Sequence, residues 1–307
     1  MTELMTAEAL TRPPGGTGSP HPERSGRAGA ARRLRRLAGF LLRRPGLVLS
    51  VLVLALVLLA AFFPGLFTAQ DPLSGVPRDK VQGPGAGHPF GTDQLGRDLF
   101  SRVVHGSALS LRATLLAVAV GLGVGSLVGL LAGYLGGRVD DVLMRGADVL
   151  LAIPNLLLAL AVVTALGFGT AKVAIAVGVT GVASFARIMR SEVLRVRGSV
   201  YVEAARASGS RWYSVLGRHV LPNSAGPVLV YAAVDFGAVL LQVSSLSFLG
   251  YGATPPTPEW GALVSGGRDY LATAWWLTTL PGLTIAATVL AANRISRALD
   301  GEGRQTR

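Results

Sequence analysis

The chain has 307 residues, of which 50% are hydrophobic and only 15% are charged, and its mean hydropathy is +0.49. Soluble domains carry about 25% charged residues, so this composition argues against a soluble enzyme and for a membrane protein. The formal net charge is +12, but the basic residues gather between apolar segments, which indicates membrane topology rather than nucleic-acid binding. The absence of cysteine excludes disulfides, iron–sulfur clusters and thiolate zinc sites.

Six apolar segments are about long enough to cross a bilayer as helices, at residues 46–66, 108–134, 142–166, 171–188, 224–248 and 274–295. The first is longer than the apolar run of a signal peptide and no A-x-A site follows it, so it predicts an anchor. The sequence therefore predicts an all-α membrane protein with six transmembrane helices. Its expected parts are a disordered basic tail (1–33), a first span with an external segment (34–107), a five-helix core (108–300) and a short tail (301–307).

Lysine and arginine fall mainly on one side of these spans. Nine arginines precede Pro45, and others follow the second span, fill the segment between the fourth and fifth spans, and close the chain. The other side holds Arg78, Lys80, Arg97, Arg102, Lys172 and Arg268. Lysine and arginine are enriched in cytoplasmic loops of membrane proteins. We therefore expect a protein of the cell membrane with both termini on the cytoplasmic side.

The second span carries glycine at every fourth position, at Gly121, Gly125, Gly129 and Gly133. On a helix these residues form one stripe, where a neighbouring backbone can come close. The stripe fits static helix packing, the interpretation we favour, or a sliding contact.

Few polar residues interrupt the spans. Pro154 is expected to kink the third span, because it lacks an N–H and clashes with the preceding turn. Asp148 is close enough to a span end to be solvated, whereas Asp235 in the fifth span is the better candidate for a residue of a transport pathway.

A polar, basic segment, residues 191–223, lies between the fourth and fifth spans. Helix formers over 201–208 predict a first helix, with Glu203 near its positive end and Gly209 closing it in a left-handed conformation. Ser210 is predicted to cap a second helix that Pro222 ends or turns.

The same segment offers a surface for a partner. Ala204, Ala205 and Ser208 give a small-residue face that permits close docking, and Arg206, Arg211 and Arg218 offer charge-assisted contacts to an acidic groove. An alternative is a loop held to anionic lipid headgroups, which explains the arginines but not the spacing of the other residues.

The order Glu203-Ala204-Ala205, Gly209 and Leu221-Pro222 resembles the EAA loop of ABC-importer permeases. Residues 88–93 (HPFGTD) with 95–98 (LGRD), and residues 246–252 (LSFLGYG) with the prolines after them, resemble the C-type subunit of the dipeptide, oligopeptide and nickel importer permeases. The resemblance covers about residues 34–300. One departure is Gln242-Val243, where the family often has an acidic residue, and this weakens transfer of pathway residues from that span.

The resemblance implies a type I ABC-importer permease fold, two ATPase subunits, a second permease subunit and an external substrate-binding protein, with peptide as the first expected cargo and nickel chelates or other small solutes as alternatives. ATP and Mg²⁺ would be bound by the partner ATPase subunits, with no cofactor or metal in this chain. The coupling residues would be Glu203, Ala204, Ala205, Arg206, Gly209, Arg211, Leu221 and Pro222.

The external motif allows two interpretations. Thr92, Asp93, Gly96, Arg97 and Asp98 form an ion-paired turn, or they contact the binding protein. His88 and His105 are too far apart in the sequence to argue for a metal site.

The chain lacks an ATP-binding loop of its own. Its two lysines follow Asp79 and Ala171, whereas a Walker A loop needs glycine before lysine. A secondary transporter would need membrane-buried carboxylates and an inverted repeat, and a membrane enzyme would need a catalytic cluster; the sequence supports neither. We therefore expect a non-catalytic permease powered by another protein.

Overall fold

The computed structural model describes residues 45–305, with side chains described through residue 298. The predicted tail over residues 1–33 lies outside the described residues. Within the described range the chain is helical apart from its loops and two isolated β-bridges, which join Gly75 to Arg97 and Thr92 to Asp98.

Five helical runs are long and apolar enough to cross a bilayer, and a sixth span exists if one bent pair counts as a single span. The five are α2 (Pro45–Phe62), α3 (Leu99–Leu135), α6 (Thr170–Arg197), α11 (Trp276–Gln305) and the continuous run of α8 (Trp212–Val215), the π-helical turn η3 (Leu216–Val220) and α9 (Leu221–Phe248). Large apolar side chains such as Leu49, Leu52 and Phe62 stay exposed on α2, as expected of a surface that faces lipid. The predicted all-α architecture is confirmed.

The third predicted span is not one helix. α4 (Gly137–Ala152) and α5 (Asn155–Leu166) meet at a bend of 99°. Pro154 lies at the junction, and Ile153 before it is extended, with ψ 131°, because proline disfavours the helical conformation in the residue that precedes it. The predicted kink is therefore a complete break.

Other helices exceed their predicted bounds, among them α11, which continues to Gln305 instead of ending near residue 295. α3 begins at Leu99 rather than near residue 108, because the Asp98 carboxylate caps its first turn by accepting from the Ser101 N–H at 2.6 Å. α6 continues to Arg197, beyond the predicted end at residue 188, so its last turns leave the apolar stretch.

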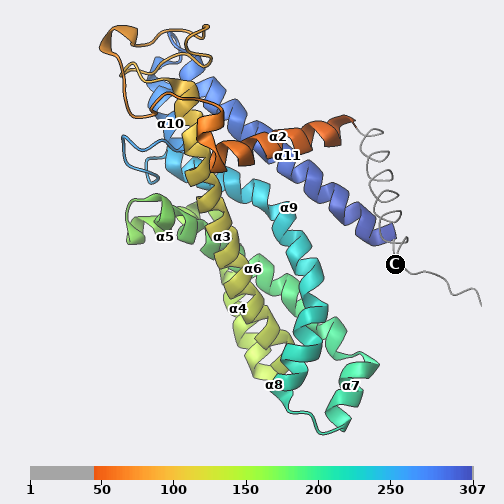
Figure 1. Ribbon diagram of the computed structural model, residues 1–307. Helices are drawn as coiled ribbons and strands as arrows, with labels where there is room; N and C mark the ends of the chain where they lie inside the picture. Colours follow the sequence, from red (N-terminus) through yellow and green to blue (C-terminus); the bar gives the residue numbers. More distant parts are fainter. Residues whose placement is uncertain (1–44, 306–307) are drawn as a thin grey trace, which may run out of the picture. The chain divides into compact units, whose positions relative to one another are not determined.

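The glycine stripe of α3 faces α6, against which α3 packs (Figure 1). A Cβ atom added at Gly125 would lie 2.5 Å from the Val182 carbonyl oxygen, and one added at Gly129 would lie 2.2 Å from the Ala186 carbonyl oxygen. Gly121 and Gly133 make similar approaches to the same helix. The two backbones are in direct contact because side chains are absent there.

Three buried clusters follow α3 along its length. The middle cluster joins α3, α5, α6 and α9 around Val163 and Val177, and another joins α3, α9, α10 (Trp260–Gly267) and α11 around Trp260. The third joins the last turns of α3 and α6 to α7 (Val200–Ala207), α8 and the start of α9. α7 and α10 thus lie at opposite ends of α3 (Figure 1).

The segment between α2 and α3 holds two short 3₁₀ helices, η1 (Pro64–Leu66) and η2 (Pro77–Asp79), and a third, η4 (Arg268–Tyr270), follows α10. These turns and the loops around them lie near α10, at the end of the molecule opposite α7.

Candidate functional site

The segment between α6 and α9 presents an exposed surface. In α7 the side chains of Glu203, Ala204 and Arg206 are exposed, and Ala205 is half-buried on the side that faces the core. Gly209, Arg211, Leu221 and Pro222 are also exposed. Val200 on α7, at 81% exposure, adds a large apolar side chain to this surface, which we call the α7 surface: residues 200–213.

Buried valines pack the α7 surface against α6. Val202 of α7, Val215 of α8 and Val220 of η3 are each 0% exposed and pack with Val193 and Val196 of α6. Burying such side chains stabilises the arrangement by about 1.5–3 kcal/mol each, so α7 is mounted on the core rather than hanging free in a loop.

Tyr134, near the end of α3, links α3 to both sides of the α7 surface. Its hydroxyl donates to the carbonyl oxygen of Trp212 at 3.1 Å, and the Arg206 guanidinium lies 5.2 Å from its ring centroid. The Arg197 side chain donates to the carbonyl oxygens of Gly133 and Tyr134 at 3.2 and 3.0 Å, closing the end of α3. These contacts connect α7 and α8 to the end of α3.

Local details of this segment differ from the prediction. Gly209 has φ +78°, the left-handed conformation that the sequence predicted. Ser210 does not cap the second helix, because Arg211 occupies the capping position and makes no side-chain cap. Nor does Pro222 end the helix: it lies in the first turn of α9, where the π-helical turn before it widens the backbone and no N–H is needed from proline.

Two ion pairs join α4 to α6 near the same end of the molecule. Arg190 makes a bidentate pair with Asp140, at 2.5 and 2.6 Å, and Arg187 donates to Asp148 at 2.6 Å. Asp148 is therefore paired on an exposed surface, which agrees with the prediction that it lies near the end of a span and is solvated. Sequence reasoning missed the Asp140–Arg190 pair, because fifty residues separate its partners.

Asp235, the predicted pathway residue, is half-buried on α9 one turn after Tyr231. The Tyr231 ring packs edge-on against Phe185 of α6, with centroids 5.0 Å apart. The structure places Asp235 near the α6–α9 contact, and its part in transport stays a prediction.

At the other end of α3 the five residues of the predicted external motif are buried. Thr92 is 0% exposed, and Asp93, Arg97 and Asp98 are each 7% exposed or less. The Asp93 carboxylate accepts from the Arg97 side chain at 2.7 Å and from its N–H at 3.0 Å, and Gly96 turns the chain with φ +74°. This geometry is the ion-paired turn that the sequence allowed.

Further bonds fasten this turn to distant parts of the chain. Asp98 lies 2.9 Å from His88 Nδ1, and the Trp276 indole N–H of α11 donates to the Thr92 carbonyl oxygen at 3.4 Å. Gly96 approaches Val76 so closely that an added Cβ would lie 2.0 Å from the Val76 carbonyl oxygen. The turn is therefore a fixed part of the fold, and its exposed neighbours, such as Leu95, form the outer surface.

A buried carboxylate that the sequence analysis did not single out caps α10. Glu259, at 0% exposure, accepts from the backbone N–H groups of Gly261 and Ala262 at 3.2 Å each, while Trp260 donates its indole N–H to the Val103 carbonyl oxygen at 2.9 Å. Burial raises the pKa of Glu259, and its hydrogen bonds oppose that shift. Glutamate is not among the residues that usually cap helices, so the local sequence does not mark this cap.

The chain is similar to a family of known transport proteins. The family model described as "Binding-protein-dependent transport system inner membrane component" matches residues 125–302.

In the part of the chain that the structure describes, no group of three or more acidic, histidine or cysteine side chains is placed to hold a metal ion.

Curated relatives cover most of the chain. It is 38% identical over 252 residues to the dipeptide transport system permease protein DppC of Alkalihalophilus pseudofirmus, covering 82% of this chain and 83% of the relative. It is 38% identical over 278 residues to the probable D,D-dipeptide transport system permease protein DdpC of Escherichia coli K12, covering 90% and 92%. It is 42% identical over 251 residues to the glutathione transport system permease protein GsiD of Shigella flexneri, covering 81% and 83%.

Two solved structures share the fold. An amino acid ABC transporter crystallised with histidines matches with a TM-score of 0.51 and 15% identity over 66% of this chain and 94% of that chain. The inward-facing MetNI methionine ABC transporter matches with a TM-score of 0.50 and 19% identity over 64% and 95%.

Proposed function

Because the chain belongs to the family of binding-protein-dependent transport system inner membrane components, we propose that it is one of two permease subunits of an ATP-driven peptide importer. The family confirms the resemblance inferred from the motifs, and the chain is a multi-pass membrane protein. In this proposal it forms half of the translocation pathway, and a partner permease subunit forms the other half.

The α7 surface carries the proposal. An ATPase partner needs an exposed patch that is also mechanically connected to the membrane helices. Glu203, Ala204 and Arg206 are exposed, while Val202 beneath them is wholly buried in a cluster that includes both α3 and α6. The basic side chains of the surface suit an acidic groove on the partner.

The packing of α3 suggests how motion passes through the molecule. The partner presses on α7, which bears on Tyr134 at the end of α3. Because α3 and α6 touch backbone to backbone along the glycine stripe, they move together and transmit the displacement toward α10. ATP binding and cargo binding each bias the same two-state equilibrium through their different affinities for its two states.

The remaining parts of the machine lie in other proteins. Two ATPase subunits would bind ATP and Mg²⁺, since neither lysine of this chain follows a glycine. An extracytoplasmic binding protein would deliver cargo to the end that holds α10, with α7 and both termini in the cytoplasm. Peptide is the proposed cargo because the relatives are named for dipeptides and glutathione.

Transport in reconstituted vesicles tests this proposal. The chain, its partner permease and the ATPase subunits are placed in vesicles with the binding protein, and ATP-dependent uptake of a labelled dipeptide is measured. Glu203→Lys should reduce uptake about tenfold or more, since it reverses a charge in the docking surface. Glu203→Asp is the matched control, because it keeps a negative charge at the same exposed position.

The secondary-transporter alternative predicts the opposite pattern. Uptake driven by an ion gradient alone, with no ATPase subunit present, would contradict the proposal, as would normal uptake by Glu203→Lys.

A further inference from the structure

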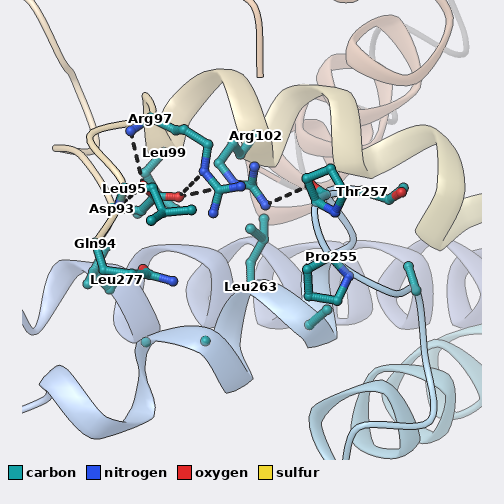
Figure 2. Close-up of a pocket in the computed structure, with 15 residues that line it drawn as sticks. Asp93, Gln94, Leu95, Arg97, Leu99, Arg102, Pro255, Thr257, Leu263 and Leu277 are labelled. Atoms are coloured by element: carbon teal, nitrogen blue, oxygen red, sulfur yellow. Dashed lines mark hydrogen bonds and ion pairs between the residues drawn. The ribbon is translucent and has the colours of Figure 1, made fainter. Parts of the chain in front are cut away.

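A pocket of about 400 Å³ opens beside the buried turn at the α10 end. Its walls come from four separate parts of the chain: the turn after η2, the start of α3, the loop and helix around α10, and the start of α11 at Leu277 (Figure 2). The residues that matter most for its chemistry are Asp93, Gln94, Arg97, Arg102, Thr257 and Leu263.

The pocket wall carries an excess of positive charge. Arg97 Nε lies 2.7 Å from Asp93 Oδ2, and Arg102 Nε lies 3.6 Å from the same oxygen. Two guanidinium groups thus share one carboxylate, as Figure 2 shows. No other charged side chain lines the pocket, so its wall has a net charge of about one positive unit.

Arg102 is held in place beside Asp93. Its terminal nitrogens donate to the carbonyl oxygens of Pro72 and Pro256 at 2.8 and 3.2 Å. The whole residue is 5% exposed, and its buried Nε, which no acceptor among the described residues bonds within hydrogen-bond distance, lies 3.6 Å from Asp93 Oδ2. One carboxylate therefore has to balance two largely buried guanidinium groups, and an anion in the pocket would offset the remaining positive charge.

The rest of the wall selects among anions. Leu99, Leu263, Leu277 and the prolines at 255 and 256 are apolar, so the pocket suits a carboxylate on a short aliphatic stem better than a fully hydrated ion. Gln94 is half-buried and Thr257 is exposed, so the pocket is reached from outside past these two side chains. Both line the pocket beside the start of α3, whereas the α7 surface lies beside the last turn of α3.

We propose that this pocket receives a glutamate or aspartate side chain presented by the extracytoplasmic binding protein. This inference rests on the proposed function, which places the binding protein at this end of the chain. The two guanidinium groups supply the charge, and the apolar wall takes the aliphatic stem.

The absence of cysteine allows a direct measurement of the pocket's potential. Thr257→Cys places one thiol at the pocket, and Thr273→Cys places one on an exposed turn outside the pocket. In lipid nanodiscs, the rates of modification by an anionic and a cationic methanethiosulfonate reagent are compared. The anionic-to-cationic rate ratio should be about fourfold higher at position 257, the effect of one unit charge at roughly 10 Å in water.

Occupancy is tested with glutarate, which carries a carboxylate on the same stem as glutamate. Glutarate should slow modification at position 257 more than chloride at the same ionic strength does, and it should not slow modification at position 273. Gln94→Glu should remove the excess in the rate ratio, compared with Gln94→Met, which adds no charge. Equal ratios at the two thiols, or no protection by glutarate, would overturn the anion site.

The identity of the occupant is tested on the complete transporter. Gln94→Glu should weaken association of the binding protein about tenfold relative to Gln94→Met, because it places a like charge beside the incoming carboxylate. Unchanged association would refute docking, even if glutarate protects the thiol. Failure of the proposed function is seen separately, as wild-type uptake that needs neither ATPase nor binding protein.

Discussion

The contact between α3 and α6 makes a quantitative prediction through two glycines of one helix. At Gly129 an added Cβ would lie 2.2 Å from the Ala186 carbonyl oxygen, 2.9 Å from the Arg190 nitrogen and 2.9 Å from Met189 Cβ. Two of these three atoms belong to the backbone and cannot rotate away. At Gly123, by contrast, nothing lies within 4 Å of an added Cβ.

The magnitude follows from this difference. Alanine at either position gains about 1 kcal/mol of helix propensity over glycine. At Gly129 the helices must also separate by about 1 Å to restore ordinary contact distances, an overpacking that costs about 1–3 kcal/mol. Gly129→Ala should therefore be about 1–3 kcal/mol less stable than Gly123→Ala.

Denaturant unfolding of the two variants in mixed micelles measures this difference, and dipeptide uptake measures its effect on transport. Gly123→Ala should match or exceed the wild type in stability and should transport normally. Gly129→Ala should lose stability and uptake together. Equal stability of the two variants would refute the claim that α3 and α6 are held backbone to backbone.

Three further predictions concern single groups. Tyr134→Phe removes the hydrogen bond to Trp212 but keeps the contacts of the ring, and it should lower the free energy of unfolding by about 1 kcal/mol. An unchanged unfolding midpoint would contradict a stabilising bond between Tyr134 and Trp212. Gly209→Val should lower ATP-driven uptake more than Gly209→Asn, because valine resists φ +78° and asparagine tolerates it; equal uptake would show that this conformation is unimportant. Because burial raises the pKa of Glu259, folded protein binds its proton more tightly than unfolded protein does. The contribution of this group to stability is therefore fully present below the ordinary glutamate range and is lost as pH rises through the raised pKa. Glu259→Gln should flatten this fall above the ordinary glutamate range in thermal unfolding curves recorded at a series of pH values, and a wild-type slope in the variant would refute the assignment.

The spans and the α7 segment could be predicted because both leave one-dimensional signals. Bilayer thickness sets the length of each apolar run, and left-handed Gly209 follows from the preference of glycine for that conformation at a helix end. The break at Pro154 was predicted in position but not in size, since the 99° bend depends on how α4 and α5 each pack against α6.

The burial of the turn at residues 92–98 and the polar caps could not be predicted in the same way. Asp93 and Arg97 are charged, so their side chains would be expected on the surface. Both are buried, because the folded chain brings residues of α3, α10 and α11 to the same place. Ser110 and Glu259 are 149 residues apart in the sequence, and the residues around each give no indication that the two side chains meet. Proline in the first turn of α9 misled the prediction of a helix end, because a π-helical turn before it lets the helix continue.

Site-specific cross-linking from the α7 surface tests the central claim most directly. Ala204→Cys introduces an exposed and unique thiol in α7, and a photoactivatable cross-linker on this thiol is illuminated in the assembled transporter. The account predicts an adduct with an ATPase subunit, whereas the same cross-linker at Asp269→Cys, at the opposite end, should give none. An α7 surface that cross-links only to lipid, or an ATPase adduct formed equally from both positions, would contradict it.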